Sequence, residues 1–291
     1  MIDRIPLPAT VPLLLAVLAC KADGPATTPL PAGSASYSGA LGPGPDFEAP
    51  AGRLSARAFP SEVGGGAELT GAFADGPPLS FHTESAREGS CRIISFTATS
   101  CDPACPGDQA CIAGGCVAYP ARTDLGAVEW TYTGGTRTVT PDGTLAYYAS
   151  ATDAAEGPMS LEVGGVLLES PTAPLMVPDG DWSAALSGRG SGDAVLGWTN
   201  PMDGARVRLH MTDCTGSHGG LAANELECEG PDTGELVIPA AFMDLMEEAD
   251  WSRGECGSHV FHRYHAAALP DDDQVRFEVR SGDGLFWRPD F

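Results

Sequence analysis

The stretch Ala205-Arg206-Val207-Arg208-Leu209-His210-Met211 decides the fold, because its apolar and polar residues alternate. Successive side chains of a β-strand point to opposite faces of the sheet, so this period of two predicts a strand with one face in a core and the other in water. Two sheets that each bury such a face pack together into a sandwich. The stretch therefore predicts an all-β protein.

Similar short runs recur along the rest of the chain. From about Glu62 onward they are rich in Thr, Val, Tyr, Trp and Phe, and Gly, Pro and Asp clusters separate them. The predicted strands cover residues 67–73, 92–99, 127–133, 137–140, 145–149, 160–169, 194–199, 206–212, 221–228, 236–238, 259–265, 275–280 and 285–288. This pattern is typical of antiparallel sheets, and we expect an immunoglobulin-like or jelly-roll-like β-sandwich. Five tryptophans are expected in its core: Trp130, Trp182, Trp198, Trp251 and Trp287.

One short helix is predicted after Pro239. Proline suits the first helical position, and Phe242, Leu245, Met246 and Ala249 recur at the spacing of one buried stripe. The helix is expected to be about three turns long, at 3.6 residues a turn.

The cysteines predict disulfides. The chain has nine cysteines, of which Cys20 is considered separately below as a site of lipid attachment. The other eight are Cys91, Cys101, Cys105, Cys111, Cys116, Cys214, Cys228 and Cys256. The cluster at residues 101–116 lacks the Cys-x2-Cys pairs of a zinc ribbon, so it predicts a small disulfide knob. We prefer the pairs Cys101–Cys111 and Cys105–Cys116, which leaves Cys91 for Cys256 or another late cysteine.

The N-terminus predicts export. The apolar run at residues 11–19 holds nine residues, where a membrane span needs about 20, and it ends at Cys20. Val17-Leu18-Ala19-Cys20 resembles the lipobox of bacterial lipoproteins, which implies a lipid on Cys20. We therefore expect a signal peptide at 1–19, a lipidated cysteine and disordered Pro/Gly-rich tether at 20–60, N-terminal strands and the cysteine-rich knob at 61–120, and the sandwich domain at 121–291.

The charge excludes one class of partner. The chain has 16 Lys and Arg against 39 Asp and Glu, a formal net charge of −23. Removal of residues 1–19 takes away one acid, Asp3, and one base, Arg4, so the charge is unchanged. Binding to nucleic acid requires a clustered basic surface, and the bases here are scattered. No nucleic-acid partner is expected.

Candidate reacting groups are few. His259, His262 and His265 are weak metal candidates, because a strand at 259–265 would point neighbouring histidines to opposite faces. Asp232-Thr233-Gly234 occurs once, without the second triplet of an aspartic protease, and is interpreted as a turn. The sequence contains no Gly-x-Ser-x-Gly, P-loop or His-Glu-x-x-His motif. A site assembled from distant residues would draw on several of His210, His218, His259, His262, Asp213 and Glu225.

Several short motifs taken together resemble uncharacterised exported lipoproteins of myxobacteria and related bacteria. These proteins share a lipobox, a Gly/Pro/Ser-rich spacer, a cysteine cluster and then a β-rich domain. The matching residues are Cys20, the spacer to Pro50, the run at residues 111–117, Leu196-Gly197-Trp198-Thr199, Cys228, Asp232-Thr233-Gly234 and Ile238-Pro239-Ala240. The resemblance implies a surface β-sandwich of unknown ligand and supplies no catalytic residue.

These observations predict a cell-envelope lipoprotein that acts as a surface binding or structural module without catalysis or cofactor. It is expected at the outer membrane or cell surface, or else in the periplasm or medium. Its expected partners are the membrane, through the lipid on Cys20, and an extracellular protein or glycan. The alternative is a secreted hydrolase or a metal-binding protein built around His259, His262 and His265.

Mass spectrometry of the protein extracted from the envelope tests the export hypothesis. We expect residues 1–19 to be absent and diacylglycerol to be bound to Cys20, because the thiol is the group that carries the lipid. The Cys20→Ala variant is expected to lack the lipid. An unprocessed N-terminus with every sulfhydryl titratable would contradict the hypothesis.

Overall fold

The computed structural model describes residues 44–47, 51–59, 65–96, 100–154, 157–172, 176–186, 192–212, 223–248, 259–269, 272–280 and 285–287. Neither helix within these ranges has the length and apolar character needed to cross a membrane. Trp251, Cys214, Cys256, His218, Asp213 and Ala249 lie outside the described residues.

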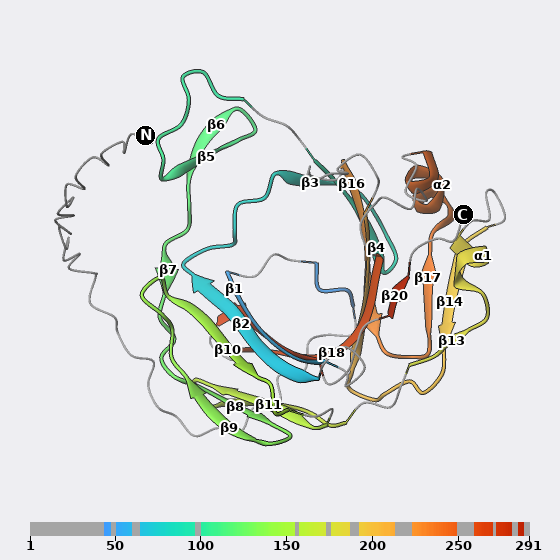
Figure 1. Cartoon of the computed structure of the whole chain (residues 1–291). Helices are drawn as coiled ribbons and strands as arrows, with labels where there is room; N and C mark the ends of the chain where they lie inside the picture. The colour runs from blue at the N-terminus through green and yellow to red at the C-terminus, as the bar shows by residue number, and fades with distance from the viewer. Residues whose placement is uncertain are drawn as a thin grey trace, which may run out of the picture.

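The main element is an eleven-stranded sheet, which curves around a concave side (Figure 1). Its order is β10 (Ala146–Ala151), β2 (Gly66–Ala74), β1 (Gly52–Phe59), β19 (Asp272–Arg280), β18 (His259–Leu269), β15 (Arg206–Thr212), β16 (Asn224–Pro231), β4 (Cys91–Phe96) and β3 (His82–Glu88). Two short strands extend it: β7 (Arg122–Thr123) pairs with β2, and β20 (Leu285–Trp287) pairs with β18.

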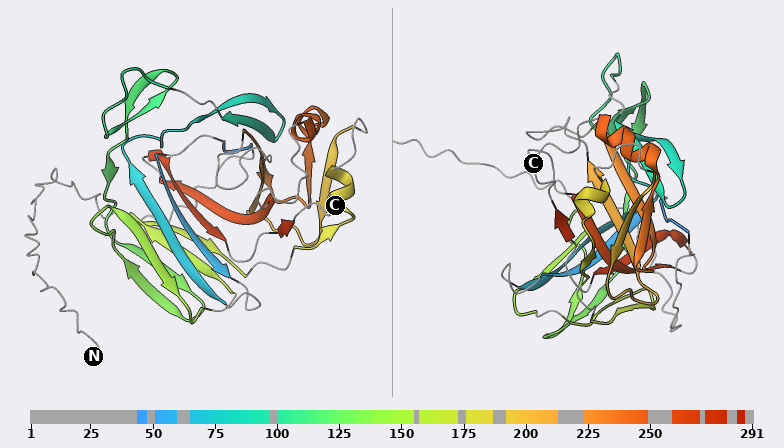
Figure 2. Two further views of the ribbon diagram at one scale, coloured as in Figure 1. Left: turned by 45° about the horizontal axis from the view of Figure 1, so that its top comes forward. Right: turned by 90° about the vertical axis from the view of Figure 1, so that its right-hand side faces the viewer.

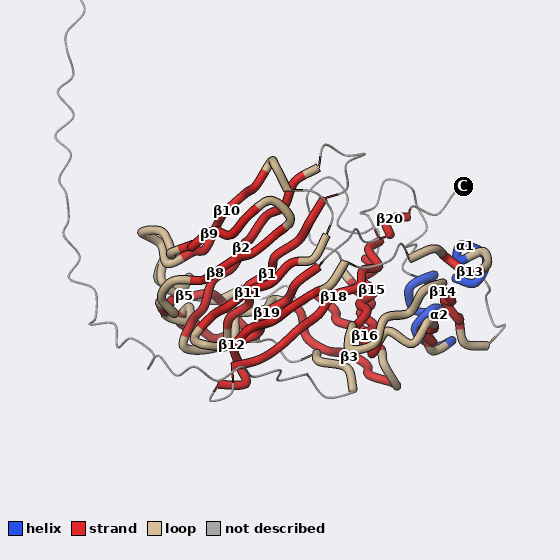
Figure 3. Tube along the Cα trace, turned by 90° about the horizontal axis from the view of Figure 1, so that it is seen from below, coloured by secondary structure: helices blue, strands red, loops and turns tan. Residues whose placement is uncertain are grey.

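Two smaller sheets cover the convex side at opposite ends, as Figure 2 shows from other directions. The first has the order β12 (Val166–Ser170), β11 (Met159–Val163), β8 (Val128–Tyr132) and β9 (Gly135–Val139). The second has the order β13 (Pro178–Asp179), β14 (Ala194–Trp198) and β17 (Glu235–Ile238). The helices α1 (Trp182–Leu186) and α2 (Ala240–Glu248) lie beside β13 and β14 (Figure 3).

Each small sheet closes a separate hydrophobic core against the convex face. Leu54, Leu69 and Phe277 of the large sheet pack with Trp130 and Leu161 in the first core. In the second core, Leu209, Leu226 and Phe261 pack with a cluster that includes Leu196 and Trp198. Trp130, Trp182 and Trp198 are buried, as expected for the tryptophans of a sandwich. The all-β, sandwich-like prediction is confirmed.

The strand pairing corrects the expected domain boundaries. Residues 52–59 form β1 in the middle of the large sheet, so the tether expected at 20–60 ends earlier in the chain. β1 pairs in parallel with β19, near the other end of the chain, so the sheet is not wholly antiparallel. Strands from both sides of the boundary at residue 120 share this sheet, and residues 61–120 therefore do not form a separate unit.

Three local predictions also require correction. The strand expected at 160–169 is a hairpin of β11 and β12, because Gly164 and Gly165 adopt positive φ values of 58° and 81°, which a tight turn requires. A second helix, α1, is present besides α2. In α2 Phe242 and Met246 are buried as expected, but Leu245 is 47% exposed and Met243 is buried, because the buried stripe is rotated towards the side of Met243.

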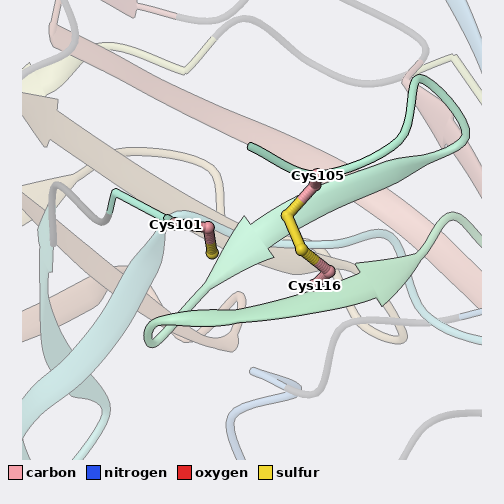
Figure 4. A group of neighbouring side chains, drawn as sticks. All are labelled: Cys101, Cys105 and Cys116. Atoms are coloured by element: carbon pink, nitrogen blue, oxygen red, sulfur yellow. A yellow bond between two sulfur atoms is a disulfide. The ribbon is translucent and has the colours of Figure 1, made fainter. Parts of the chain in front are cut away.

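The three disulfides between described cysteines include both expected knob pairs. Cys101 pairs with Cys111 and Cys105 with Cys116, around the hairpin of β5 (Gln109–Ile112) and β6 (Gly115–Ala118). Figure 4 shows the Cys105–Cys116 bond crossing this hairpin. The third bond joins Cys91 of β4 to Cys228, directly opposite on β16, so the partner of Cys91 is another late cysteine and not Cys256.

Loss of the Cys91–Cys228 bond is expected to destabilise the protein. The bond closes a sequence separation of 137 residues within the second core. We expect the Cys91→Ala/Cys228→Ala variant to lose about 2–5 kcal/mol in the free energy of unfolding, measured by denaturant titration. The matched control is Cys105→Ala/Cys116→Ala, whose loop is short and lies outside both cores. An equal or larger loss in the control would contradict this assignment.

Candidate ligand-binding cavity

The concave face of the large sheet is polar because of the alternation at residues 205–211. Arg206, Arg208 and His210 of β15 point to this face, while the apolar residues between them enter the second core. Arg208 lies opposite Glu229 of β16 on one side and His262 of β18 on the other. Because paired residues share a face, charged side chains from neighbouring strands meet there.

Two buried carboxylates join the arginines into a network. Glu278 of β19 accepts a hydrogen bond from Arg208 Nη1 at 2.9 Å, and its oxygens lie 3.5 Å from Arg53 Nη1 and 3.4 Å from Arg280 Nη2. Glu229 accepts from both Arg206 and Arg208, at 2.8–3.1 Å. Such pairs are stable away from water only when each charge is compensated, so the network fixes the relative positions of β1, β15, β16 and β19.

The charges set the ionisation of their neighbours. Burial by itself raises the pKa of Glu278, but Arg208, Arg53 and Arg280 outweigh it and bring the pKa to about 2. Burial, together with Arg280 and Arg208, holds the pKa of His262 well below its usual range. Glu278 is therefore ionised and His262 neutral at physiological pH.

A short segment before β1, residues 44–47, lies against this polar face; we call it the strap. The carbonyl of Gly44 accepts a hydrogen bond from Arg206, and the amide of Asp46 donates to Glu229. Phe47 is 5% exposed, with its ring beside the guanidinium groups of Arg87 and Arg92 at 5.2 and 4.8 Å. These contacts give the strap charged and cation–π partners on the sheet.

A cavity of about 790 Å³ lies beside the strap. It is lined by Asp46, Phe47, Ala51, Gly52, Arg53, Ala72, Phe73, Ala74, Pro78, Leu79, Arg92, Tyr119, Pro120, Arg122, Arg208, Glu227 and Glu229. The lining combines three aromatic rings, four guanidinium groups and three carboxylates. Gly52 lies directly opposite Phe73, and a Cβ on this glycine would overlap the phenyl ring. A volume of this size is typical of small-molecule sites.

The lining residues do not form a catalytic arrangement. They include no serine, threonine, cysteine, histidine or lysine. Glu227 and Glu229 share a face about 7 Å apart, a separation that glycosidases use for an acid and a base. Both oxygens of Glu229 are, however, occupied by Arg206 and Arg208, and Arg92 donates twice to Glu227. A pair of free carboxylates is therefore not present in this lining.

The three candidate histidines do not meet. His259, His262 and His265 lie on β18, where neighbouring members of the series face opposite sides. His262 faces the concave side beside Arg208, whereas His265 contacts Ser170 of β12 at 3.0 Å on the convex side. The strand therefore keeps these three histidines apart, and they do not come together in one site.

Asp232 of the Asp-Thr-Gly triplet has a structural role. It is buried, accepts hydrogen bonds from Trp198 Nε1 at 2.7 Å and the Met202 amide at 2.9 Å, and pairs with Arg263. Gly234 follows with a φ of 89° in the turn before β17. The prediction of a turn is confirmed, and the carboxylate is fully engaged in holding it.

Two members of the assembled-site hypothesis do meet. His210 Nε2 lies 3.1 Å from Glu225, and His82 Nε2 lies 3.6 Å from the same carboxylate. Among the described residues, the group whose ligand atoms are close enough for one metal ion is Cys101, Cys105 and Cys116. All three are in disulfides, so they offer no thiolate.

Comparison of the chain with protein-family models, curated proteins and solved structures finds no match. The cavity must therefore be interpreted from its own residues.

The arginines and aromatic residues of the cavity were not among the predicted site residues. Arg53-Leu54-Ser55-Ala56-Arg57-Ala58 alternates as clearly as residues 205–211, and this pattern marks β1. This strand was not predicted, because the alternating residues directly follow a Pro/Gly-rich stretch that was interpreted as a tether. Tyr119 and Arg122 carry no local signal, because Tyr119 belongs to the connection between β6 and β7 and Arg122 to the two-residue strand β7.

Acid stability tests the network. A folded-state pKa of about 2 for Glu278, below the ordinary 4.5, means that its stabilisation is present above pH 4.5 and is lost as the pH falls towards 2. Between pH 5 and 2 the wild-type free energy of unfolding is expected to fall by about 3 kcal/mol more than that of Glu278→Gln. The exposed Glu162→Gln variant is expected to follow the wild type. Parallel curves for wild type and Glu278→Gln would exclude the proposed network.

Proposed function

We propose that the chain is an exported, lipid-anchored protein of a bacterial envelope that binds a small ligand in its concave cavity without catalysing a reaction. The observation that carries this proposal is the cavity itself. The cavity has a volume of about 790 Å³, combines apolar residues with seven charged ones, and lies on a sheet that a disulfide crosslinks. Sites that bind small molecules share these properties.

Export is supported by the cysteine chemistry. Six cysteines form three disulfides, and disulfides persist in oxidising compartments such as the periplasm and the cell surface. The apolar run before Cys20 supplies a route out of the cytosol. The strap follows the residues after Cys20 in the sequence, so the proposed anchor and the cavity belong to consecutive parts of the chain.

The absence of catalysis is supported by the lining. Hydrolysis requires a nucleophile or an activated water together with a proton donor or acceptor. The carboxylates that line this cavity are held by arginines, and the lining contains no imidazole, thiol, serine or threonine. These groups are suited to binding and orientation.

The proposal is tested with the neutral fluorescent probe N-phenyl-1-naphthylamine, whose emission rises in apolar sites. Saturable binding to the folded wild-type protein is expected. Ala74 lines the cavity, so the Ala74→Trp variant should lose at least about tenfold in affinity because the indole fills the space. The control is Ala118→Trp, an exposed position on β6 outside the lining. Absence of saturable binding, or equal binding to Ala74→Trp, would contradict the proposal.

A further inference from the structure

The cavity carries cations that the protein itself compensates poorly. This matters because the chain as a whole is strongly acidic, with a net charge of −23, and its bases are few. Four of them, all arginines, line this one cavity: Arg53, Arg92, Arg122 and Arg208. Arg92 and Arg208 have close carboxylate partners at 2.6 and 2.9 Å. Arg53 and Arg122 do not.

Arg53 shares its carboxylate partner, Glu278, with two other arginines. Its Nη1 atom lies 3.5 Å from Glu278, which also interacts with Arg208 and Arg280. The Nε–H of Arg53 is buried and has no hydrogen-bond partner among the described residues. The Arg53 side chain as a whole is nevertheless 38% exposed, so the guanidinium remains accessible to an anion.

Arg122 has a carbonyl partner but no acidic one. Its Nη1 donates to the Thr144 carbonyl at 3.4 Å, and no described carboxylate lies within the 4.0 Å of an ion pair. The Asp142 carboxylate interacts with the Arg122 guanidinium only electrostatically, at a distance beyond that of an ion pair. The guanidinium therefore lines the cavity with its charge uncompensated at close range.

The sheet places these two arginines on the same wall. Arg53 lies opposite Ala72, and Arg122 lies opposite Ala74, on the two sides of β2. Residues 72 and 74 share a face, so the two arginine backbones are separated by roughly 12 Å from the strand spacing. Arginine side chains reach across such a gap, and the two small alanines leave the space between them open.

The remaining walls include apolar residues. Tyr119, Pro120 and Leu79 line the same cavity, and Tyr119 is 54% exposed, whereas the Phe73 ring is buried in the first core. A ring-shaped body packs against such surfaces, with aromatic contacts adding to the burial of apolar area. The cavity thus places the guanidinium donors of Arg53 and Arg122 next to an apolar wall.

We infer that the cavity binds an organic anion: a ring-containing molecule whose carboxylate, sulfate, sulfonate or phosphate group lies between Arg53 and Arg122. This inference rests on the proposed function, because it names the chemistry of the same site. Guanidinium groups bind such planar or tetrahedral anions through paired hydrogen bonds. The net negative charge of the protein is screened beyond about 8 Å at physiological salt, so the local cations dominate at the site.

A matched pair of probes tests the inference. 8-Anilinonaphthalene-1-sulfonate differs from N-phenyl-1-naphthylamine by its sulfonate alone. Fluorescence titration of the folded full chain is expected to give at least about tenfold tighter binding of the sulfonate. Arg53→Gln and Arg122→Gln are each expected to remove most of this preference, measured as the ratio of the two probe affinities within the same variant. The control is Arg57→Gln, on the same strand face as Arg53 but outside the lining.

The outcomes separate the inference from the proposal on which it rests. Loss of the preference in both cavity variants, with the preference retained in Arg57→Gln, supports the inference. Equal affinities for the two probes, or a preference that survives both substitutions, overturns it, while neutral-probe binding that Ala74→Trp removes still supports the cavity. Failure of both probes to bind the wild type overturns both the inference and the proposed function. Circular dichroism of each variant confirms that the comparison is between folded proteins.

Discussion

The interaction of Glu278 with three arginines is the constraint on which the rest of the structure depends. Its carboxylate lies on the concave face of the large sheet, beside Arg53, Arg208 and Arg280 from three different strands. A sheet face that is both polar and largely shielded is stable only when its charges are compensated in place. The ion pairs satisfy this condition, so the apolar residues of the same strands are free to form two cores on the convex side.

The division between the two cores follows from the same alternation. β18 contributes Phe261 to the second core and Ala267 and Leu269 to the first, with Arg263 and His265 between them. Arg263 pairs with Asp232 and His265 contacts Ser170, so polar groups meet at the boundary. β18 therefore contributes side chains to both hydrophobic cores, and its His262 and Tyr264 lie on the charged face.

The sequence predicted those features that are local. The strand predicted at residues 206–212 has the same bounds as β15. The spacing of the cysteine cluster predicted both knob disulfides, and the single Asp-Thr-Gly triplet predicted a turn. The cavity was not predicted, because its lining comes from segments between residues 46 and 229 that only the pairing order brings together. The parallel contact of β1 with β19 joins the two ends of the chain, and no local pattern records it.

Titration of the Glu278 side chain tests the central claim most directly. In the protein with ¹³C-labelled glutamate, the carboxyl resonance of Glu278 is identified by its absence from the Glu278→Gln spectrum and followed against pH. The network predicts that this carboxyl stays ionised as long as the protein is folded, with a pKa of about 2. A midpoint near the ordinary value of 4.5 in the folded protein would contradict the account.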